Sequence, residues 1–220
     1  MFSAIAGRYD LLNRVLSLGT DRSWRRRTCD LLEVAPGMLA ADLCCGTGDL
    51  ALALAARGAR VVAADFSHGM LTQAAAKGTP RVTAADSLRL PFRDATFDRV
   101  TVGFGVRNLE DLGAGLAEIR RVLKPGGVAG ILEFATPSPA PFRIVYHAYL
   151  RLLVPALGAL ISGKGSAYSY LSSSIREFPD QQRMTALLRD SGFAPVRHFD
   201  FARGIAALYI AQRPKTSSAD

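Results

Sequence analysis

Cysteine is scarce in this sequence of 220 residues, and its three cysteines follow neither a metal-binding nor a disulfide pattern. Cys44 and Cys45 are neighbours in a Gly-rich segment, and Cys29 stands apart from them. No C-x-x-C spacing occurs, and an odd count argues against a framework of paired cysteines. These absences exclude a disulfide-stapled secreted scaffold, predict no metal site, and favour the reducing cytoplasm.

An uninterrupted apolar run long enough to cross a bilayer is also missing. The most apolar stretch, Ile144 to Ile161, contains His147, Arg151 and Pro155, whereas a spanning helix needs about 20 residues without a buried charge. We expect a helix bent near Pro155 that packs on the domain or contacts lipid. The N-terminus lacks a basic region followed by an apolar core and a cleavage site, so no secretory signal is expected.

The composition is that of a globular protein with a strong positive charge. Hydrophobic residues make up 49%, enough for one full core, and the net charge is +8. We therefore expect a single domain over residues 1–213. Residues 214–220 have nothing apolar to bury and are expected to form a disordered tail. The charge favours anionic partners, either nucleic acid or an acidic membrane surface, without choosing between them.

Apolar runs alternate with helical patterns along the chain, which predicts an α/β fold: a mostly parallel sheet with helices on both faces. The seven expected strands are Leu39–Leu43, Arg60–Ala64, Arg81–Ala85, Arg99–Phe104, Val128–Phe134, Pro195–Phe201 and Ala206–Gln212. The expected helices are Tyr9–Leu16, Ser23–Leu32, Asp49–Ala56, one begun by Asp65 and Ser67 with Ser67 as N-cap, Leu112–Leu123 and Asp180–Ser191. Residues 1–36 would form a helical lid or platform, Lys124-Pro125-Gly126-Gly127 a turn, and the last two strands a hairpin about Arg203-Gly204.

The sharpest local signal is the segment Asp42-Leu43-Cys44-Cys45-Gly46-Thr47-Gly48-Asp49, where a strand ends and a helix begins. Gly46 and Gly48 would let the backbone pass close to a ligand, where a Cβ atom would collide. Alone, this turn is compatible with a dinucleotide, a flavin or S-adenosylmethionine, or with a tight turn that binds nothing.

Two acids narrow the choice of ligand. Asp65 ends the second expected strand, where a carboxylate can accept hydrogen bonds from both ribose hydroxyls. Asp86, followed by Ser87, ends the third and could accept a hydrogen bond from an adenine amino group. The alternative for each acid is a solvated strand end or a helix cap. A full G-x-G-x-x-G is lacking, which favours S-adenosylmethionine, a nucleoside without phosphate, with its amino-acid end against the Gly46–Gly48 backbone.

Short motifs around these residues follow in a fixed order: Asp42…Gly46-Thr47-Gly48, Asp65, Asp86-Ser87…Leu90-Pro91-Phe92, Phe97-Asp98 and Arg121-Val122-Leu123-Lys124-Pro125-Gly126-Gly127. Over about Leu39 to Phe134, the sequence resembles a class I methyltransferase. The resemblance implies a Rossmann-like, seven-stranded sheet with one antiparallel strand at its edge.

A narrower resemblance runs from Phe2 to Arg213, nearly the whole chain. Its motifs are Ile5-Ala6-x-Arg8-Tyr9-Asp10-Leu11-Leu12-Asn13, Gly103-Phe104-Gly105-Val106-Arg107-Asn108, Leu132-Glu133-Phe134, Tyr168-x-Tyr170-Leu171-x-x-Ser174-Ile175-Arg176 and Phe178-Pro179-Asp180. On these motifs the sequence resembles the menaquinone/ubiquinone biosynthesis C-methyltransferase family, UbiE/MenG. Matching positions imply cofactor contacts by Thr47, Asp65, Asp86 and Ser87. Where family members often carry His or Gln, this chain has Asp21. We also expect a helical insertion over residues 135–180 on the substrate side.

The substrate that this resemblance implies is a polyprenyl quinol methylated on a ring carbon. Arg107 and Asn108 follow the fourth expected strand, at the carboxyl end where open α/β sheets bind ligands. A guanidinium can stabilise a developing phenolate or orient a water that takes the proton, although its pKa is too high for it to act as a base. The alternative is an arginine bonded to the C-terminal helices. His147 is a candidate general base, or else a histidine satisfied within the core.

The ring is either a naphthoquinol or a benzoquinol. The motif Cys44-Cys45-Gly46-Thr47 resembles that of family members that act only in menaquinone biosynthesis. It therefore favours demethylmenaquinol over the 2-polyprenyl-6-methoxy-1,4-benzoquinol of ubiquinone biosynthesis. Two other functions stay open: an RNA methyltransferase and a non-catalytic cofactor-binding subunit. The positive charge supports the first, but no added basic, aromatic-rich RNA domain or Asn-Pro-Pro-Tyr-type motif is present, so no nucleic-acid partner is expected.

The prenyl tail needs an apolar groove or access from the bilayer. Candidate lining residues are Phe142, Ile144, Val145, Tyr149, Leu152 and Leu153, or these residues simply pack in the core. The run Arg25-Arg26-Arg27 either contacts anionic headgroups or forms a solvated helix face. We expect a cytoplasmic protein, and the sequence leaves open both peripheral contact with the inner face of the membrane and assembly into a homo-oligomer.

Overall fold

The computed structural model describes residues 17, 19–137, 146, 174–175 and 177–215. The expected helix Tyr9–Leu16, the bent apolar helix over Ile144–Ile161 and the tail beyond residue 215 lie outside the described residues. So do His147 and the six residues suggested to line a groove for the prenyl tail.

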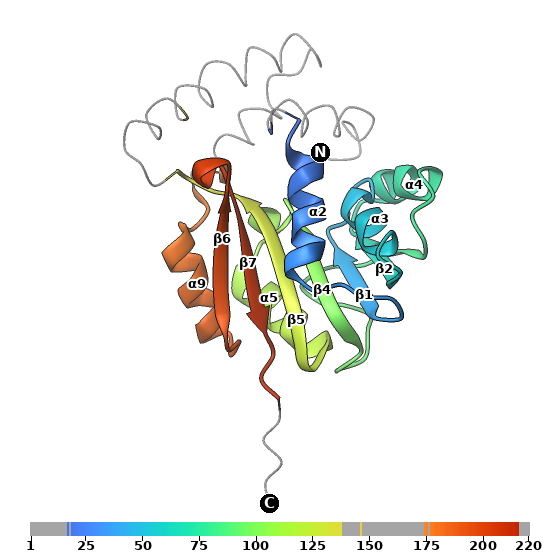
Figure 1. Cartoon of the computed structure of the whole chain (residues 1–220). Coiled ribbons are helices and arrows are strands. Elements are labelled where there is room, and N and C mark those ends of the chain that lie inside the picture. Colours follow the sequence, from blue (N-terminus) through green and yellow to red (C-terminus); the bar gives the residue numbers. More distant parts are fainter. Residues whose placement is uncertain (1–16, 18, 138–145, 147–173, 176, 216–220) are drawn as a thin grey trace, which may run out of the picture.

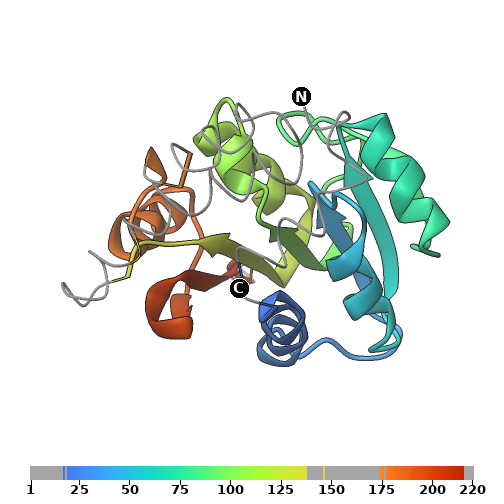
Figure 2. The same ribbon diagram turned by 90° about the horizontal axis from the view of Figure 1, so that it is seen from above.

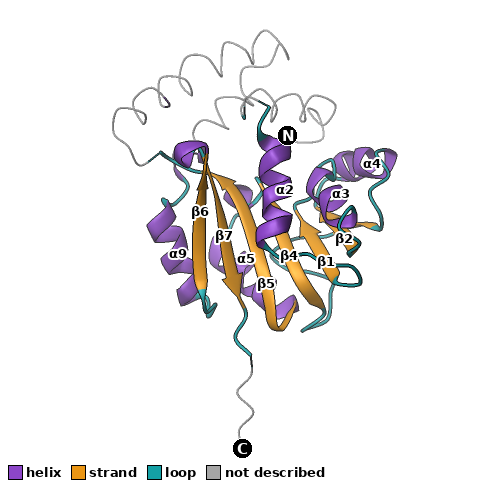
Figure 3. Ribbon diagram, viewed as in Figure 1, coloured by secondary structure: helices purple, strands orange, loops and turns teal. Residues whose placement is uncertain are grey.

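The core of the described structure is a seven-stranded sheet in the order β3-β2-β1-β4-β5-β7-β6 (Figures 1 and 3). Its strands are β1 (Leu39–Leu43), β2 (Arg60–Asp65), β3 (Val82–Ala84), β4 (Phe97–Gly103), β5 (Leu123–Phe134), β6 (Val196–Phe201) and β7 (Ala206–Gln212). Strands β1 to β5 pair in parallel, and β7 runs antiparallel to both β5 and β6. The predicted fold class is confirmed.

One detail of the predicted topology is wrong. The antiparallel strand is β7, and it lies between β5 and β6 rather than at the edge. The last two strands form the expected hairpin, turning through Ala202–Gly204, and its second strand is the one that pairs with β5 over Val128–Phe134. The first strand of the hairpin therefore becomes the edge.

Helices cover both faces of this sheet. The helices are α2 (Asp21–Leu31), α3 (Asp49–Ala55), α4 (His68–Ala76), α5 (Leu112–Val122) and α9 (Gln181–Asp190), with 3-10 turns η2 (Val106–Asn108) and η4 (Ala202–Gly204). Successive residues of β1 point to opposite faces: Ala40 packs in a cluster with α2 and α3, and Ala41 in a cluster with α5 and α9. Figure 2 shows α2 on one side of the sheet and α5 and α9 on the other.

Local sequence accounts for most of these boundaries. Strands Leu39–Leu43 and Ala206–Gln212 have the predicted limits. Ser67 caps α4 as expected, its hydroxyl accepting a hydrogen bond from the Met70 amide at 3.4 Å. Gly192, with φ +83°, follows α9 as a left-handed residue.

The prediction of a turn at Lys124–Gly127 is wrong, because the structure places these residues within β5. Helix α5 ends at Val122, one residue before the predicted end, and β5 begins at once with Leu123, which pairs with Phe97. The register shifts before Val128, and Gly126 has φ +80°. Residues 124–127 therefore form an irregularity within β5, opposite Asp98 alone, and glycine at position 126 allows the left-handed backbone conformation found there.

Among the described helices, none combines the length and apolar character needed to span a bilayer.

Candidate active site

A cavity of about 280 Å³ lies at the carboxyl ends of β1, β2, β3 and β4. This is the edge where parallel α/β sheets bind ligands. Its walls are formed by Cys44, Gly46, Asp65, Phe66, Met70, Asp86, Ser87, Leu88, Phe104, Gly105, Asn108, Leu109 and Glu110. Four of the seven predicted cofactor residues are among them, namely Gly46, Asp65, Asp86 and Ser87.

Asp65 organises the Gly-rich turn as well as facing the cavity. One carboxylate oxygen accepts the Gly46 amide at 2.8 Å, and the other accepts the Ser67 amide at 2.8 Å. A carboxylate oxygen can accept more than one hydrogen bond, so both oxygens retain acceptor capacity toward the cavity. The backbone bonds hold this carboxylate in place before any ligand arrives.

Glycine is needed at position 48 for a steric reason other than the one expected from the sequence. It adopts φ +84°, and a Cβ atom there would lie 2.1 Å from the Thr79 hydroxyl oxygen. The close approach is therefore to the protein behind the turn and not to a ligand. Thr47 is also buried behind the cavity wall, where its hydroxyl accepts a hydrogen bond from Lys77 at 2.8 Å. Cofactor contacts by Thr47 and Gly48 stay predictions.

Asp42 lies beneath the turn rather than on the cavity wall. It is 1% exposed, and the Thr101 hydroxyl donates to its Oδ1 at 2.7 Å. Its Oδ2 has no hydrogen-bond partner among the described residues. Burial raises the pKa of Asp42 to about 7, against the opposing effects of the Thr101 hydrogen bond and the Arg25 charge. Asp42 therefore holds a buried acceptor oxygen beneath the turn, and its contact with a cofactor stays a prediction.

Asp86, Ser87 and Leu88 line the cavity where β3 ends, away from the Gly-rich turn that follows β1. Asp86 accepts the Leu88 amide at 2.9 Å, which shapes the loop after β3. The Ser87 hydroxyl lies 3.3 Å from the thiol sulfur of Cys44. Burial raises the pKa of the Cys44 thiol to about 12, so it stays protonated and unreactive at neutral pH.

Sequence reasoning missed two hydrophobic walls of the cavity. Phe66 is 80% exposed although it follows the buried strand β2, and such a ring can stack on a base. The sequence signal for this role is the position of Phe66 directly after Asp65. Phe104, by contrast, is buried beside the cavity and packs on Phe134, with ring centroids 4.5 Å apart.

The structure separates the two predicted catalytic neighbours. Asn108 lines the cavity, whereas the side chain of Arg107 is only 4% exposed and points toward β5. There it forms an ion pair with Glu133 at 2.6 Å and donates to the carbonyl of Phe104. Glu133 belongs to β5, so this ion pair is made within the sheet. The alternative of an arginine bonded to the C-terminal helices stays a prediction, because most of residues 138–176 lie outside the described residues.

The basic run on α2 is also divided. Arg26 and Arg27 are exposed, but Arg25 is buried and pairs with Asp21. The expected single exposed face of three arginines is thus wrong, because a helix turns neighbouring residues to different sides. Within the described ranges, no three His, Cys, Asp or Glu side chains come together as metal ligands would.

Residues 1–213 match the ubiE/COQ5 methyltransferase family. The chain belongs to this family. It is 48% identical to the demethylmenaquinone methyltransferase of Thermus thermophilus over 222 residues, which covers 97% of this chain and 100% of that protein. It is 45% identical to the demethylmenaquinone methyltransferase of Mycolicibacterium gilvum over 214 residues, covering 97% and 93%.

Solved structures agree on the fold of this ubiE/COQ5 methyltransferase. A methyltransferase from Haloferax volcanii, in complex with the Trm112 methyltransferase activator, superposes with a TM-score of 0.72 at 20% identity, covering 97% of this chain and 98% of that one. An S-adenosylmethionine-dependent methyltransferase from Methanococcus maripaludis gives 0.69 at 17% identity, with 99% and 96% covered. At such identities the likeness bears on the fold alone.

The cofactor of this methyltransferase is S-adenosylmethionine, and the described residues fit it. Asp65 offers a fixed carboxylate with spare acceptor capacity, and Phe66 an exposed ring beside it. Asp42 supplies a buried oxygen without a hydrogen-bond partner among the described residues. No phosphate-binding arrangement is required of the turn, since this cofactor has none.

Proposed function

We propose that this protein transfers the methyl group of S-adenosylmethionine to a ring carbon of demethylmenaquinol, giving menaquinol. The observation that carries the proposal is the identity of 45–48% over 97% of the chain to proteins named demethylmenaquinone methyltransferase. The cavity supports it, because a few carboxylate and other polar groups stand among aromatic and aliphatic side chains on its wall, which suits a nucleoside cofactor.

In this proposal, the described residues bind and align rather than attack. The bound cofactor supplies an electrophilic methyl group and a sulfur leaving group. Asp65 would hold the ribose hydroxyls, and Asp86 the adenine amino group. The quinol carbon forms the new C–C bond, and its ring proton then leaves to solvent or a base. Alignment and exclusion of water would provide much of the acceleration.

Asn108 and Arg107 take different parts. The amide of Asn108, on the cavity wall, is placed to hydrogen-bond a quinol hydroxyl. Arg107 acts as a positioning residue: its backbone amide and its guanidinium both bond Glu133, at 3.3 Å and 2.6 Å, which fixes the turn η2 that carries Asn108. We keep His147 as a candidate base, although it lies outside the described residues.

The test is methyl transfer from labelled S-adenosylmethionine to reduced demethylmenaquinone and, separately, to a demethylated polyprenyl benzoquinol. We expect label on the naphthoquinol, and a loss of roughly a hundredfold or more in kcat for Asn108→Ala, the range seen when one transition-state hydrogen-bond donor is removed. Glu110→Ala, an exposed change on the same wall, is the matched control.

If only the benzoquinol took up label, the substrate would be a benzoquinol and not demethylmenaquinol. If neither quinol took up label while the cofactor still bound, the proposal would fail. RNA methylation or a non-catalytic cofactor-binding role would then be the functions to test.

We also propose that the protein contacts the membrane surface peripherally, since its substrate carries a prenyl chain. Arg22, Arg26 and Arg27 are exposed on α2 and would face anionic headgroups. Arg26 and Arg27 belong to the Arg25-Arg26-Arg27 run, and Arg22 lies one helical turn before Arg26.

A further inference from the structure

A buried arginine lies next to the cofactor turn, on an element outside the Gly-rich motif. Arg25, in the middle of α2, is 7% exposed. Its guanidinium carbon lies 5.7 Å from the ring centroid of Phe104, which lines the cavity. Its terminal nitrogen is 3.8 Å from a carboxylate oxygen of Asp49, the residue directly after Gly48. Arg25 is not itself a cavity wall, but it packs on a wall residue, Phe104, and lies beside the Gly-rich turn at the β1 and β4 end.

Asp21 holds this guanidinium in place. It precedes Arg25 by one helical turn and forms an ion pair with it. The other carboxylate oxygen of Asp21 accepts a hydrogen bond from the Ser17 hydroxyl at 3.1 Å. Burying a charged guanidinium is costly unless it is paired. The arrangement keeps one buried cation at a fixed position near the turn.

The direction of the cofactor follows from the order of the strands. With adenine at Asp86 after β3 and ribose at Asp65 after β2, the third part of the molecule runs on toward β1 and β4. That part is an amino acid, which carries both a carboxylate and an ammonium group. A zwitterion needs a cation and an acceptor together, and this end of the site has Arg25 alongside Asp42 and Asp49.

We infer that Arg25 binds the carboxylate of the methionine portion of S-adenosylmethionine, with Asp21 as the positioning residue for its guanidinium. Helix α2 is then part of the cofactor site and not only a cover for the sheet. Guanidinium and carboxylate form charge-assisted hydrogen bonds in a matching planar geometry. The inference rests on the cofactor but not on the identity of the quinol.

The test compares two ligands that differ in the amino-acid portion. S-adenosylhomocysteine contains that portion, whereas 5′-deoxy-5′-methylthioadenosine keeps only adenine, ribose and the thioether. Dissociation constants are measured by titration calorimetry for the full chain, for Arg25→Met and for Asp21→Asn. Arg26→Met, an exposed change on the same helix, is the matched control.

We expect Arg25→Met to weaken S-adenosylhomocysteine about tenfold to a hundredfold, the loss of a hydrogen-bonded charge pair, and to leave methylthioadenosine within about twofold. Asp21→Asn should show a smaller loss with the same selectivity, Arg25→Lys should restore part of the affinity, and Arg26→Met should change neither ligand.

Equal weakening of both ligands by Arg25→Met would assign Arg25 a structural role and overturn the inference. Unchanged binding of both would overturn it as well. Since the readout is binding, failure here is distinct from failure of quinol methylation. Normal binding of methylthioadenosine also shows that the variant is folded.

Discussion

At the scale of single residues, Asp42 has the most perturbed environment among the acids around the turn. Its folded pKa of about 7 exceeds its ordinary value of 3.8 because burial disfavours the charged form. The folded state thus binds an extra proton between these values, so its contribution to stability is present below pH 3.8 and lost as the pH rises to 7. A shift of this size corresponds to roughly 4 kcal/mol.

Asp42→Asn should remove this dependence. The amide oxygen can still accept the Thr101 hydroxyl, and the side chain no longer titrates. Urea unfolding of both proteins between pH 4 and pH 8 should show the wild type losing stability relative to the variant as the pH rises. Parallel curves would mean that Asp42 is ionised throughout, with a partner for its Oδ2.

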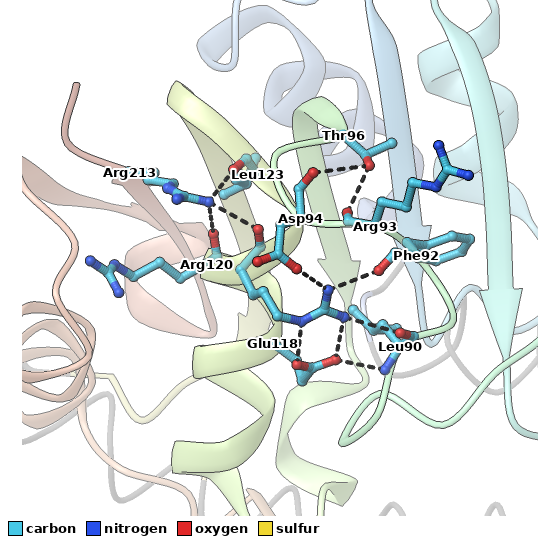
Figure 4. Close-up of polar contacts among 10 residues, drawn as sticks. Leu90, Phe92, Arg93, Asp94, Thr96, Glu118, Arg120, Leu123 and Arg213 are labelled. Carbon is cyan, nitrogen blue, oxygen red and sulfur yellow. Dashed lines mark hydrogen bonds and ion pairs between the residues drawn. The ribbon is translucent and has the colours of Figure 1, made fainter. Parts of the chain in front are cut away.

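At the scale of elements, Arg121 on α5 bonds the connection between β3 and β4. Its partners Glu118, Asp94, Phe92 and Leu90 lie close together in Figure 4. It pairs with Glu118 at 2.6 Å and with Asp94 at 2.6 Å, and donates to the carbonyls of Phe92 and Leu90. Glu118 in turn accepts the Leu90 amide at 2.7 Å. The same connection begins with Asp86 at the cavity, so the bonds of Arg121 stabilise one wall of the site.

Replacing Arg121 with Met should lower the free energy of unfolding by about 2 kcal/mol, the order of one charged hydrogen-bonded pair. The Arg121 hydrogen bond lowers the pKa of Glu118 below its usual 4.5, so this contribution is present above that pH and lost as the pH falls. Urea unfolding at pH 7 and pH 4 should therefore show a smaller difference at pH 4. The exposed Arg93→Met serves as control, and an unchanged difference at pH 4 would contradict the argument.

The sequence predicts elements well and long-range pairings poorly. Alternating apolar runs locate the strands, and capping residues such as Ser67 and Gly192 mark helix ends, because these signals are local. The pairing of Arg107 with Glu133 and the contact of Gly48 with Thr79 depend on elements 26 and more positions away. The place of β7 within the sheet has the same origin.

At the scale of the whole molecule, the net charge of +8 gives a basis for association with anionic membranes. Replacing Arg22, Arg26 and Arg27 together with Gln should weaken binding to vesicles containing phosphatidylglycerol at least about tenfold, since each basic residue near such a surface contributes about 1 kcal/mol. Co-sedimentation measures this directly.

The control carries the same change in charge elsewhere: Arg60, Arg81 and Arg93, exposed residues at the starts of β2 and β3 and in the β3–β4 connection, replaced by Gln. If both triple variants lost affinity equally, net charge alone would govern association, and α2 would not be the contacting face.

The order of the strands also governs how the chain is completed during synthesis. Strand β5 lies inside the sheet, yet its partner on one side is β7, the last strand to be made. Until Ala206–Gln212 leaves the ribosome, β5 presents an unpaired edge, the kind of surface that recruits other strands. A chain cut short before β7 would hold every residue of the cavity wall and still expose that edge. Truncation before Ala206 is therefore expected to act through aggregation and not through the chemistry of the site.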